Sequence, residues 1–200
     1  FPAKPARTPM NVCGSVAAYK ALELCRMFQS CDLACGTTLT GAAQQFVTPL
    51  SFSSLGCDPV HSAMFDAGAD VFAHLYPGQA AQALVLAPAT AAMLANIAHG
   101  MADDILSCQC LSYSGPLVIA PAMNVRMWEN PATQANLDLL RQRGHTIVAP
   151  GCGELACGDQ GQGRLAELDD IFLHTLRSLS PQDIQGKKVM ITLGPTREQW

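Results

Sequence analysis

The sequence predicts a single α/β domain with a doubly wound parallel sheet, and three observations support this. The apolar runs at residues 83–87 and 117–120 have the length and composition of buried parallel strands. A proline and, further on, a helix-capping residue follow each run, and apolar residues then recur at helical spacing. The chain of 200 residues suits one such domain with a sizeable core and leaves no room for a second.

Composition excludes several classes of protein. The net charge is −4 and the 12 Lys and Arg residues are scattered, so we expect no nucleic-acid partner. Hydrophobic residues make up 49% of the chain and charged residues only 14%, which indicates a homo-oligomer that buries part of its surface. No apolar run approaches the roughly 20 residues of a membrane span, so no membrane partner is expected.

The nine cysteines indicate a reducing environment. Their number is odd, they form no disulfide framework, and no charged-then-apolar signal segment precedes them, so we expect a cytoplasmic protein without disulfides. The closest pairs lack the repeated two-residue spacing of zinc sites, and no histidine stands at a matching offset. These pairs are Cys31/Cys35, Cys108/Cys110 and Cys152/Cys157. We therefore predict no metal site.

The amino-terminal part contains a candidate phosphate site. Residues 1–9 are expected to be a disordered lead, and a short strand at residues 10–12 then leads to Gly14 and Ser15 at the start of a helix. Free backbone N–H groups and the positive end of the helix dipole favour a phosphate there, and Gly14 would let it approach closely. Pro9 is discordant in a central strand, because it has no N–H to donate.

The next segments are less regular. Residues 32–36 are expected to form the second strand, and Thr40 then precedes a short helix that contains Phe46 and ends before Thr48. Phe46 suits core packing as well as ligand contact. Residues 51–68 are expected to be a meandering surface segment. The adjacent carboxylates Asp103 and Asp104 suit helix capping or binding better than acid–base chemistry.

The segment 121–128 is the feature around which the other motifs are arranged. It follows a buried strand, at the edge of the sheet where ligands bind in open α/β folds. Asn130 is expected to cap a helix that Pro131 begins, so Asn124 would lie between two rigid elements. Core packing remains the alternative role for the two methionines and the tryptophan of this segment.

A glycine-rich segment at residues 151–164 is expected to form a mobile loop, which next to an active site would serve as a lid. Its Cys157 could be catalytic, although a thiol in such a loop is often a bystander. Residues 166–179 are expected to form a helix. Residues 180–200 contain a linker followed by a new strand and turn from Gly186.

Four motifs, in residues 14–20, 100–106, 121–128 and 156–164, resemble those of the phosphopantothenoylcysteine decarboxylases, a family of flavin-dependent cysteine decarboxylases. The tail from Gly186 resembles the first strand of the synthetase domain that is fused to this decarboxylase in many bacteria. The resemblance implies a flavodoxin-like (Rossmann-like) fold, with the decarboxylase domain at residues 10–179 and a truncated synthetase-like domain beginning within residues 180–200. Cys13 departs from the family pattern, which usually has Ser or Gly there.

The resemblance also implies roles for individual residues. His74 stands where the family places its active-site histidine, Cys157 matches its proton donor, and Asn124 its ligand for the substrate carboxylate. The other four histidines have no counterpart. The implied FMN-binding residues are Gly14, Ser15, Thr40, Phe46, Ala89, Thr90 and Asp104. The implied substrate-binding residues are Asn124, Met127, Ala156, Gly158 and Arg164.

The implied activity is FMN-dependent decarboxylation of 4′-phosphopantothenoyl-cysteine to 4′-phosphopantetheine in coenzyme A biosynthesis. Cysteine has no electron sink of its own, so its thiol-bearing carbon is first oxidised to a thioaldehyde, which allows CO₂ to leave. Re-reduction, with a proton from Cys157, completes a redox-neutral cycle. The resemblance further implies trimers, or multiples of trimers, with the flavin between subunits.

Three alternatives share the fold. A flavin-binding regulatory protein without turnover is disfavoured by the intact His74, Asn124 and Cys157. A flavin prenyltransferase is disfavoured by segment 121–128 and by the cysteine-containing flap. A peptide-cysteine decarboxylase is disfavoured only by the synthetase-like tail.

Overall fold

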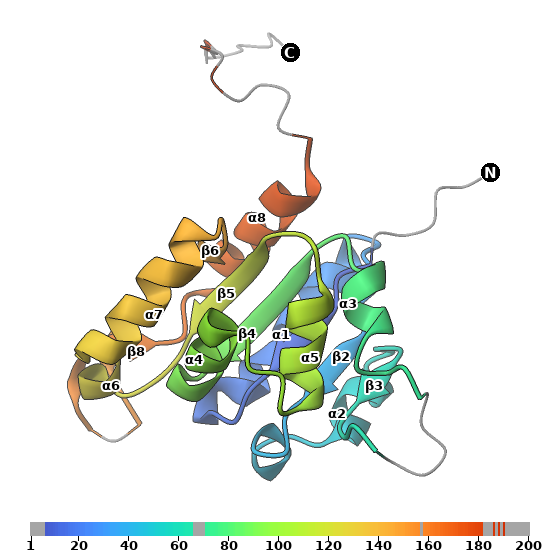
Figure 1. The fold of residues 1–200 in the computed structure, drawn as a ribbon, viewed down its shortest axis with the longest axis horizontal. Helices are drawn as coiled ribbons and strands as arrows, with labels where there is room; N and C mark the ends of the chain where they lie inside the picture. The colour runs from blue at the N-terminus through green and yellow to red at the C-terminus, as the bar shows by residue number, and fades with distance from the viewer. Residues whose placement is uncertain are drawn as a thin grey trace, which may run out of the picture.

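The core of the molecule is a six-stranded parallel sheet, seen in a computed structural model that describes residues 7–65, 71–156 and 158–181, with residues 186, 188 and 190. The strand order is β3-β2-β1-β4-β5-β6 (Figure 1). Without the two-residue edge strand β3, this is the 2-1-3-4-5 order of flavodoxin-like folds. The predicted doubly wound sheet is therefore confirmed. The strands are β1 (Met10–Val12), β2 (Thr37–Leu39), β3 (Val60–His61), β4 (Leu84–Ala89), β5 (Leu117–Pro121) and β6 (Thr146–Ile147).

Helices cover both faces of the sheet (Figure 1). One face is covered by η1 (Val16–Tyr19), α1 (Lys20–Ser30) and α8 (Leu168–Leu179). The other is covered by α4 (Ala91–His99), α5 (Ile105–Ser112) and α7 (Pro131–Gln142), with α3 (Tyr76–Ala80) packed against α5. The remaining helices are η2 (Ala43–Gln45), α2 (Pro49–Ser54) and α6 (Val125–Glu129).

Alternate residues of the central strands build two separate cores. Val85 joins the core beneath α1 and α8, whereas Leu84 and Leu86 join the core beneath α4, α5 and α7. The rings of Phe28 and Phe172, 5.7 Å apart, tie α1 to α8. Because both faces are covered, the strands can be apolar throughout, which is why the runs in β4 and β5 are continuous.

The start of the chain differs from the prediction of a disordered lead at residues 1–9. Arg7 forms a β-bridge with Ala34, and the N–H of the buried Thr8 donates to the Ala34 carbonyl at 2.9 Å. Pro9 lies just before β1, where its carbonyl accepts from the Val85 N–H, so it removes no donor from the strand itself. Residues 7–9 therefore extend the sheet, and residues 1–6 lie outside the described residues.

The second strand lies later than predicted. Asp32 adopts a left-handed conformation, with φ of 57°, just after α1 ends, and β2 begins only at Thr37. Residues 51–61, expected to meander, contribute to α2 and β3. Thr48 caps α2 by accepting from the Ser51 N–H, and Phe52 is fully buried. Residues 66–68 of that segment lie outside the described residues.

The glycine-rich segment is not an irregular loop. It forms an antiparallel pair, β7 (Gly151–Glu154) and β8 (Gln160–Arg164), which we call the ribbon. This two-stranded sheet is separate from the main one. Glycine and glutamine give neither an apolar run nor an alternating pattern, so sequence periodicity did not reveal it.

The helices predicted from Pro131 and within residues 166–179 are confirmed as α7 and α8. The short helix expected to contain Phe46 is instead the single turn η2, which ends at Gln45. Asn130 accepts from the Ala132 N–H at 2.9 Å, Pro131 is the first residue of α7, and Gly144 follows it with φ of 85°. None of the helices in the described residues is long and apolar enough to cross a membrane. The predicted synthetase-like strand from Gly186 falls mostly outside the described residues.

Candidate functional site

A cavity of about 270 Å³ lies where the carboxyl ends of β1 and β5 meet the ribbon. It is lined by residues 15–17, 122–124, 154–156 and 163–165. These ranges come from the predicted phosphate loop, the segment after β5 and the predicted flap. The fold thus brings together three motifs, the first of which lies more than a hundred residues before the other two in the chain.

The loop after β1 has the features of an anion site. Ser15 caps η1, with its Oγ accepting from the Ala17 N–H at 3.3 Å. Among the described residues, no acceptor is found for the backbone N–H groups of Gly14, Ser15 and Val16. Three donors at the start of a continuous helical segment suit a phosphate.

Gly14 also has a packing role. A Cβ atom at this position would lie 2.4 Å from Cβ of Ala42 and 2.9 Å from its carbonyl carbon. The space beside Gly14 is filled by Ala42, so the glycine allows two loops to pack.

Asn124 is held in place on both sides. Its Oδ1 accepts from the Arg126 N–H at 2.8 Å, which caps α6. Its Nδ2 donates to Oδ2 of Asp159 at 2.7 Å. The amide N–H₂ group therefore already faces a carboxylate, the same chemical group that was predicted as its ligand in the substrate.

The ribbon is attached to segment 121–128 by close contacts. The Met123 N–H donates to the Gly163 carbonyl at 2.9 Å, and Nε1 of Trp128 donates to Oε1 of Gln162 at 3.1 Å. Trp128 is buried, as its core alternative required, whereas Met127 is 49% exposed and does not line the cavity. The cavity wall is consequently built from two segments that are fixed to each other.

The predicted flap residues differ in position. Ala156 and Arg164 both line the cavity, and the guanidinium of Arg164 forms a partly exposed ion pair with Glu167 at 2.7 Å. Gly158, with φ of 85°, lies in the turn between β7 and β8 and does not line it. Cys157, between Ala156 and Gly158 in the chain, lies outside the described residues.

The other predicted cofactor ligands do not line the cavity; Thr40 and Phe46 follow β2, Ala89 ends β4, Thr90 follows it and Asp104 precedes α5. Thr90 and Asp104 cap α4 and α5 by accepting hydrogen bonds from backbone N–H groups, and Oγ1 of Thr40 accepts from the Ala43 N–H at 3.1 Å. Ala89 is buried and Phe46 is half-exposed. The capping role expected for Asp104 is confirmed.

Cys13, the departure from the family pattern, lies beside this group. Burial raises its pKa to about 12, against hydrogen bonds with Thr90 that lower it, and the charge of Asp104 raises it further. The thiol is therefore neutral at physiological pH and is a poor nucleophile.

His74 lies away from the cavity. It belongs to a turn before α3 whose Ala73 carbonyl accepts from Nε2 of Gln109 in α5 at 2.7 Å. Figure 1 shows α3 on the opposite side of the molecule from α6 and the ribbon. A single chain therefore does not bring His74 to Asn124.

Two polar residues of the site were not identified from the sequence. Asp159 holds Asn124, and Gln162 links Trp128 to the carbonyl of Pro150, at 3.0 Å. The position of Asp159, two residues after the candidate catalytic Cys157, was the sequence feature that could have identified it as a site residue. No sequence feature pointed to Gln162.

Comparison with known proteins places this geometry in a family. A family model described as Flavoprotein matches residues 4–180. The chain belongs to the flavoprotein family. This flavoprotein is 39% identical, over 191 residues, to the coenzyme A biosynthesis bifunctional protein CoaBC of Haemophilus influenzae, and the match covers 94% of the chain but 48% of that protein. The chain thus spans about half the length of such relatives.

Solved structures with the same fold include cysteine decarboxylases. A cysteine-to-serine mutant of PPC decarboxylase, complexed with pantothenoylaminoethenethiol, is 32% identical with a TM-score of 0.75, covering 86% of this flavoprotein and 97% of that chain. The FMN-dependent cysteine decarboxylase SpaF is 30% identical with a TM-score of 0.73, covering 88% and 99%.

Proposed function

We propose that this flavoprotein binds FMN and decarboxylates 4′-phosphopantothenoyl-cysteine to 4′-phosphopantetheine, as the first half of a bifunctional protein of coenzyme A biosynthesis. The observation that carries the proposal is the cavity in which Ser15, Asn124 and the ribbon meet. The similarity to CoaBC and to PPC decarboxylase supports this substrate over others.

The residues at the carboxyl edge of the sheet fit FMN. The three N–H groups at Gly14, Ser15 and Val16 supply the donors that a phosphate requires, and Ala122 and Ala156 leave room in the cavity wall. We assign Thr40, Phe46, Ala89, Thr90 and Asp104 to the rest of the cofactor, as the resemblance implies. Bound FMN would supply a reversible hydride acceptor, which gives the cysteine carboxylate the electron sink that it lacks.

Asn124 would orient the substrate by donating to its carboxylate. In the structure that donor faces Asp159, so substrate would exchange one carboxylate for another at the same amide. Cys157 would donate a proton to the decarboxylated enethiolate, and the ribbon would keep water from it.

His74 would act from a neighbouring subunit. The turn that carries it lies on the far side of the chain from Asn124, and the resemblance implies a trimer with the flavin between subunits. A mixed-subunit experiment tests this. Neither His74→Asn nor Asn124→Ala should be active alone, and refolding the two together should restore part of the activity. No recovery would argue that each chain carries a complete site. The trimer and a cytoplasmic location stay predictions.

The main test uses the purified chain. It should be yellow and should release CO₂ from 4′-phosphopantothenoyl-cysteine faster than from a peptide ending in cysteine. A colourless preparation that gains no flavin absorbance on titration with FMN would refute the cofactor assignment. A preference for the peptide would favour the peptide-cysteine decarboxylase alternative.

A further inference from the structure

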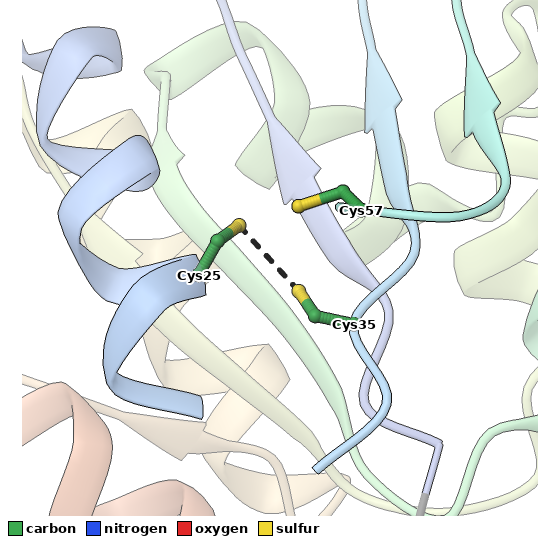
Figure 2. A group of neighbouring side chains, drawn as sticks. All are labelled: Cys25, Cys35 and Cys57. Atoms are coloured by element: carbon green, nitrogen blue, oxygen red, sulfur yellow. Dashed lines mark hydrogen bonds between the residues drawn. The ribbon is translucent and has the colours of Figure 1, made fainter. Parts of the chain in front are cut away.

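Three buried cysteines from different elements converge in one core. Cys25 lies in α1, Cys35 precedes β2 and Cys57 precedes β3, and Figure 2 shows their sulfur atoms directed toward one another. All three sulfurs lie within 4.8 Å of one another, and those of Cys25 and Cys35 are 3.4 Å apart. Each residue is at most 4% exposed. We call this group the thiol cluster.

We propose that the thiol cluster binds a soft metal ion of low coordination number, with Cu(I) as the best match. Its donor set consists of three sulfurs alone. Among the described residues, no fourth Cys, His, Asp or Glu joins the group, whereas a structural zinc site requires four ligands. Thiolate ligands favour Cu(I) among the soft ions, and Cu(I) accepts three of them.

The sulfur positions are close to those that an ion needs. Metal–thiolate bonds of about 2.3 Å in a trigonal arrangement place the sulfurs about 4 Å apart. The observed 3.4 Å between Cys25 and Cys35, and the limit of 4.8 Å for the group, bracket that spacing. Small side-chain rotations would therefore complete the site without moving the sheet.

Polar side chains lie beside two of the three sulfurs. Buried thiolates are costly unless they are hydrogen-bonded. Nε2 of Gln29 donates to Sγ of Cys57 at 3.8 Å, and Oγ1 of Thr37 lies 3.9 Å from Sγ of Cys25. Such outer partners are typical of metal sites.

A second cavity borders two of the loops that carry the proposed ligands. A larger cavity, of about 600 Å³, is lined by Ala34 and Gly36 on either side of Cys35, and by Asp58 and Pro59 just after Cys57. The loops that carry two of the ligands thus border open space. This cavity and the thiol cluster lie at the amino ends of β2 and β3, whereas Ser15 and Asn124 lie at the carboxyl edge. The metal site is therefore independent of the proposed decarboxylase site.

The test is an anaerobic competition for Cu(I) between the reduced, FMN-loaded protein and a coloured Cu(I) chelator. We expect one Cu(I) per chain, and at least a tenfold loss of affinity in each of Cys25→Ala, Cys35→Ala and Cys57→Ala. Cys110→Ala, which is equally buried but outside the cluster, and Cys31→Ala, which is exposed, are matched controls and should bind like the wild type. Retained FMN shows that a variant is folded.

X-ray absorption at the copper edge needs no variant and keeps the proposal testable if an alanine variant fails to fold. Three sulfur neighbours, without nitrogen or oxygen, are expected in the wild type. The proposal would be overturned if the absorption spectrum showed only two sulfur neighbours. It would also be overturned if Cys31→Ala lost copper binding, or if the wild type failed to compete with the chelator. A Cys25–Cys35 disulfide in freshly isolated protein, detected by mass, would also overturn it, because the two sulfurs would then be unable to bind the ion.

Discussion

Gly163→Ala should detach the ribbon from segment 121–128. A Cβ at this position would lie 2.3 Å from the Met123 carbonyl oxygen, and the backbone has φ of 152°. Gly153→Ala is the matched control. It lies in the same ribbon with φ of 153°, but its added Cβ would meet only the Arg164 guanidinium, at 3.8 Å.

Both variants incur the cost of a glycine-only backbone conformation, about 1–3 kcal/mol. Only Gly163→Ala adds a steric overlap with main-chain atoms, which costs a further ~1–3 kcal/mol. That difference corresponds to about a 5- to 150-fold increase in ribbon opening. Hydrogen exchange of the Met123 amide measures it, because that N–H donates to the Gly163 carbonyl. Equal exchange rates in the two variants would refute the steric argument.

Three further predictions concern single side chains. Asn124→Ala should keep FMN bound but slow decarboxylation by about 10- to 150-fold, because a hydrogen bond to a charged group is lost. A near wild-type rate would instead show that Asn124 is a purely structural turn residue. Cys157→Ser should release CO₂ but stall with enethiol bound and the flavin reduced, whereas His74→Asn should leave the flavin oxidised. Mixing each variant anaerobically with substrate, and following flavin absorbance together with CO₂ release, distinguishes the two. Burial, together with the charge of Arg143, lowers the pKa of His145, whose Nδ1 accepts from the Leu117 N–H. The unfolded chain therefore binds more protons, so the free energy of unfolding should fall as pH drops below about 6.5. If the free energy of unfolding of His145→Asn depended on pH with the same slope, His145 would not be the cause of the fall.

The sequence was most informative for strands that are buried on both faces and for helices that begin at a capping residue, because both produce a recognisable local pattern. The continuous apolar runs of β4 and β5 and the Asn130–Pro131 start of α7 were predicted for the right physical reasons. The short strands β2 and β3 were misplaced or missed, because Thr37-Thr38-Leu39 and Val60-His61 contain no apolar run. Their place in the sheet depends on neighbouring strands that local sequence does not encode.

The candidate site was predictable only in part. The motifs around Ser15, Asn124 and Arg164 do meet at one cavity, as their shared edge of the sheet suggests. The contact between Asn124 and Asp159, and the distance of His74 from both, depend on how the ribbon and the turn before α3 fold. The thiol cluster was missed because cysteine spacing was judged along the chain, where 10 and 22 residues separate its members.

Because the ribbon is a sheet of its own, the part of the molecule that covers the cavity can change during evolution without disturbing the register of the six parallel strands. Its turn, between Glu154 and Gln160, is closed by local hydrogen bonds between Leu155 and Asp159 and between Gly158 and Leu155. Insertions or exchanges there would alter which thiol-bearing acid is admitted while the cofactor edge stays intact. One scaffold could in this way acquire new substrates by replacing a single hairpin.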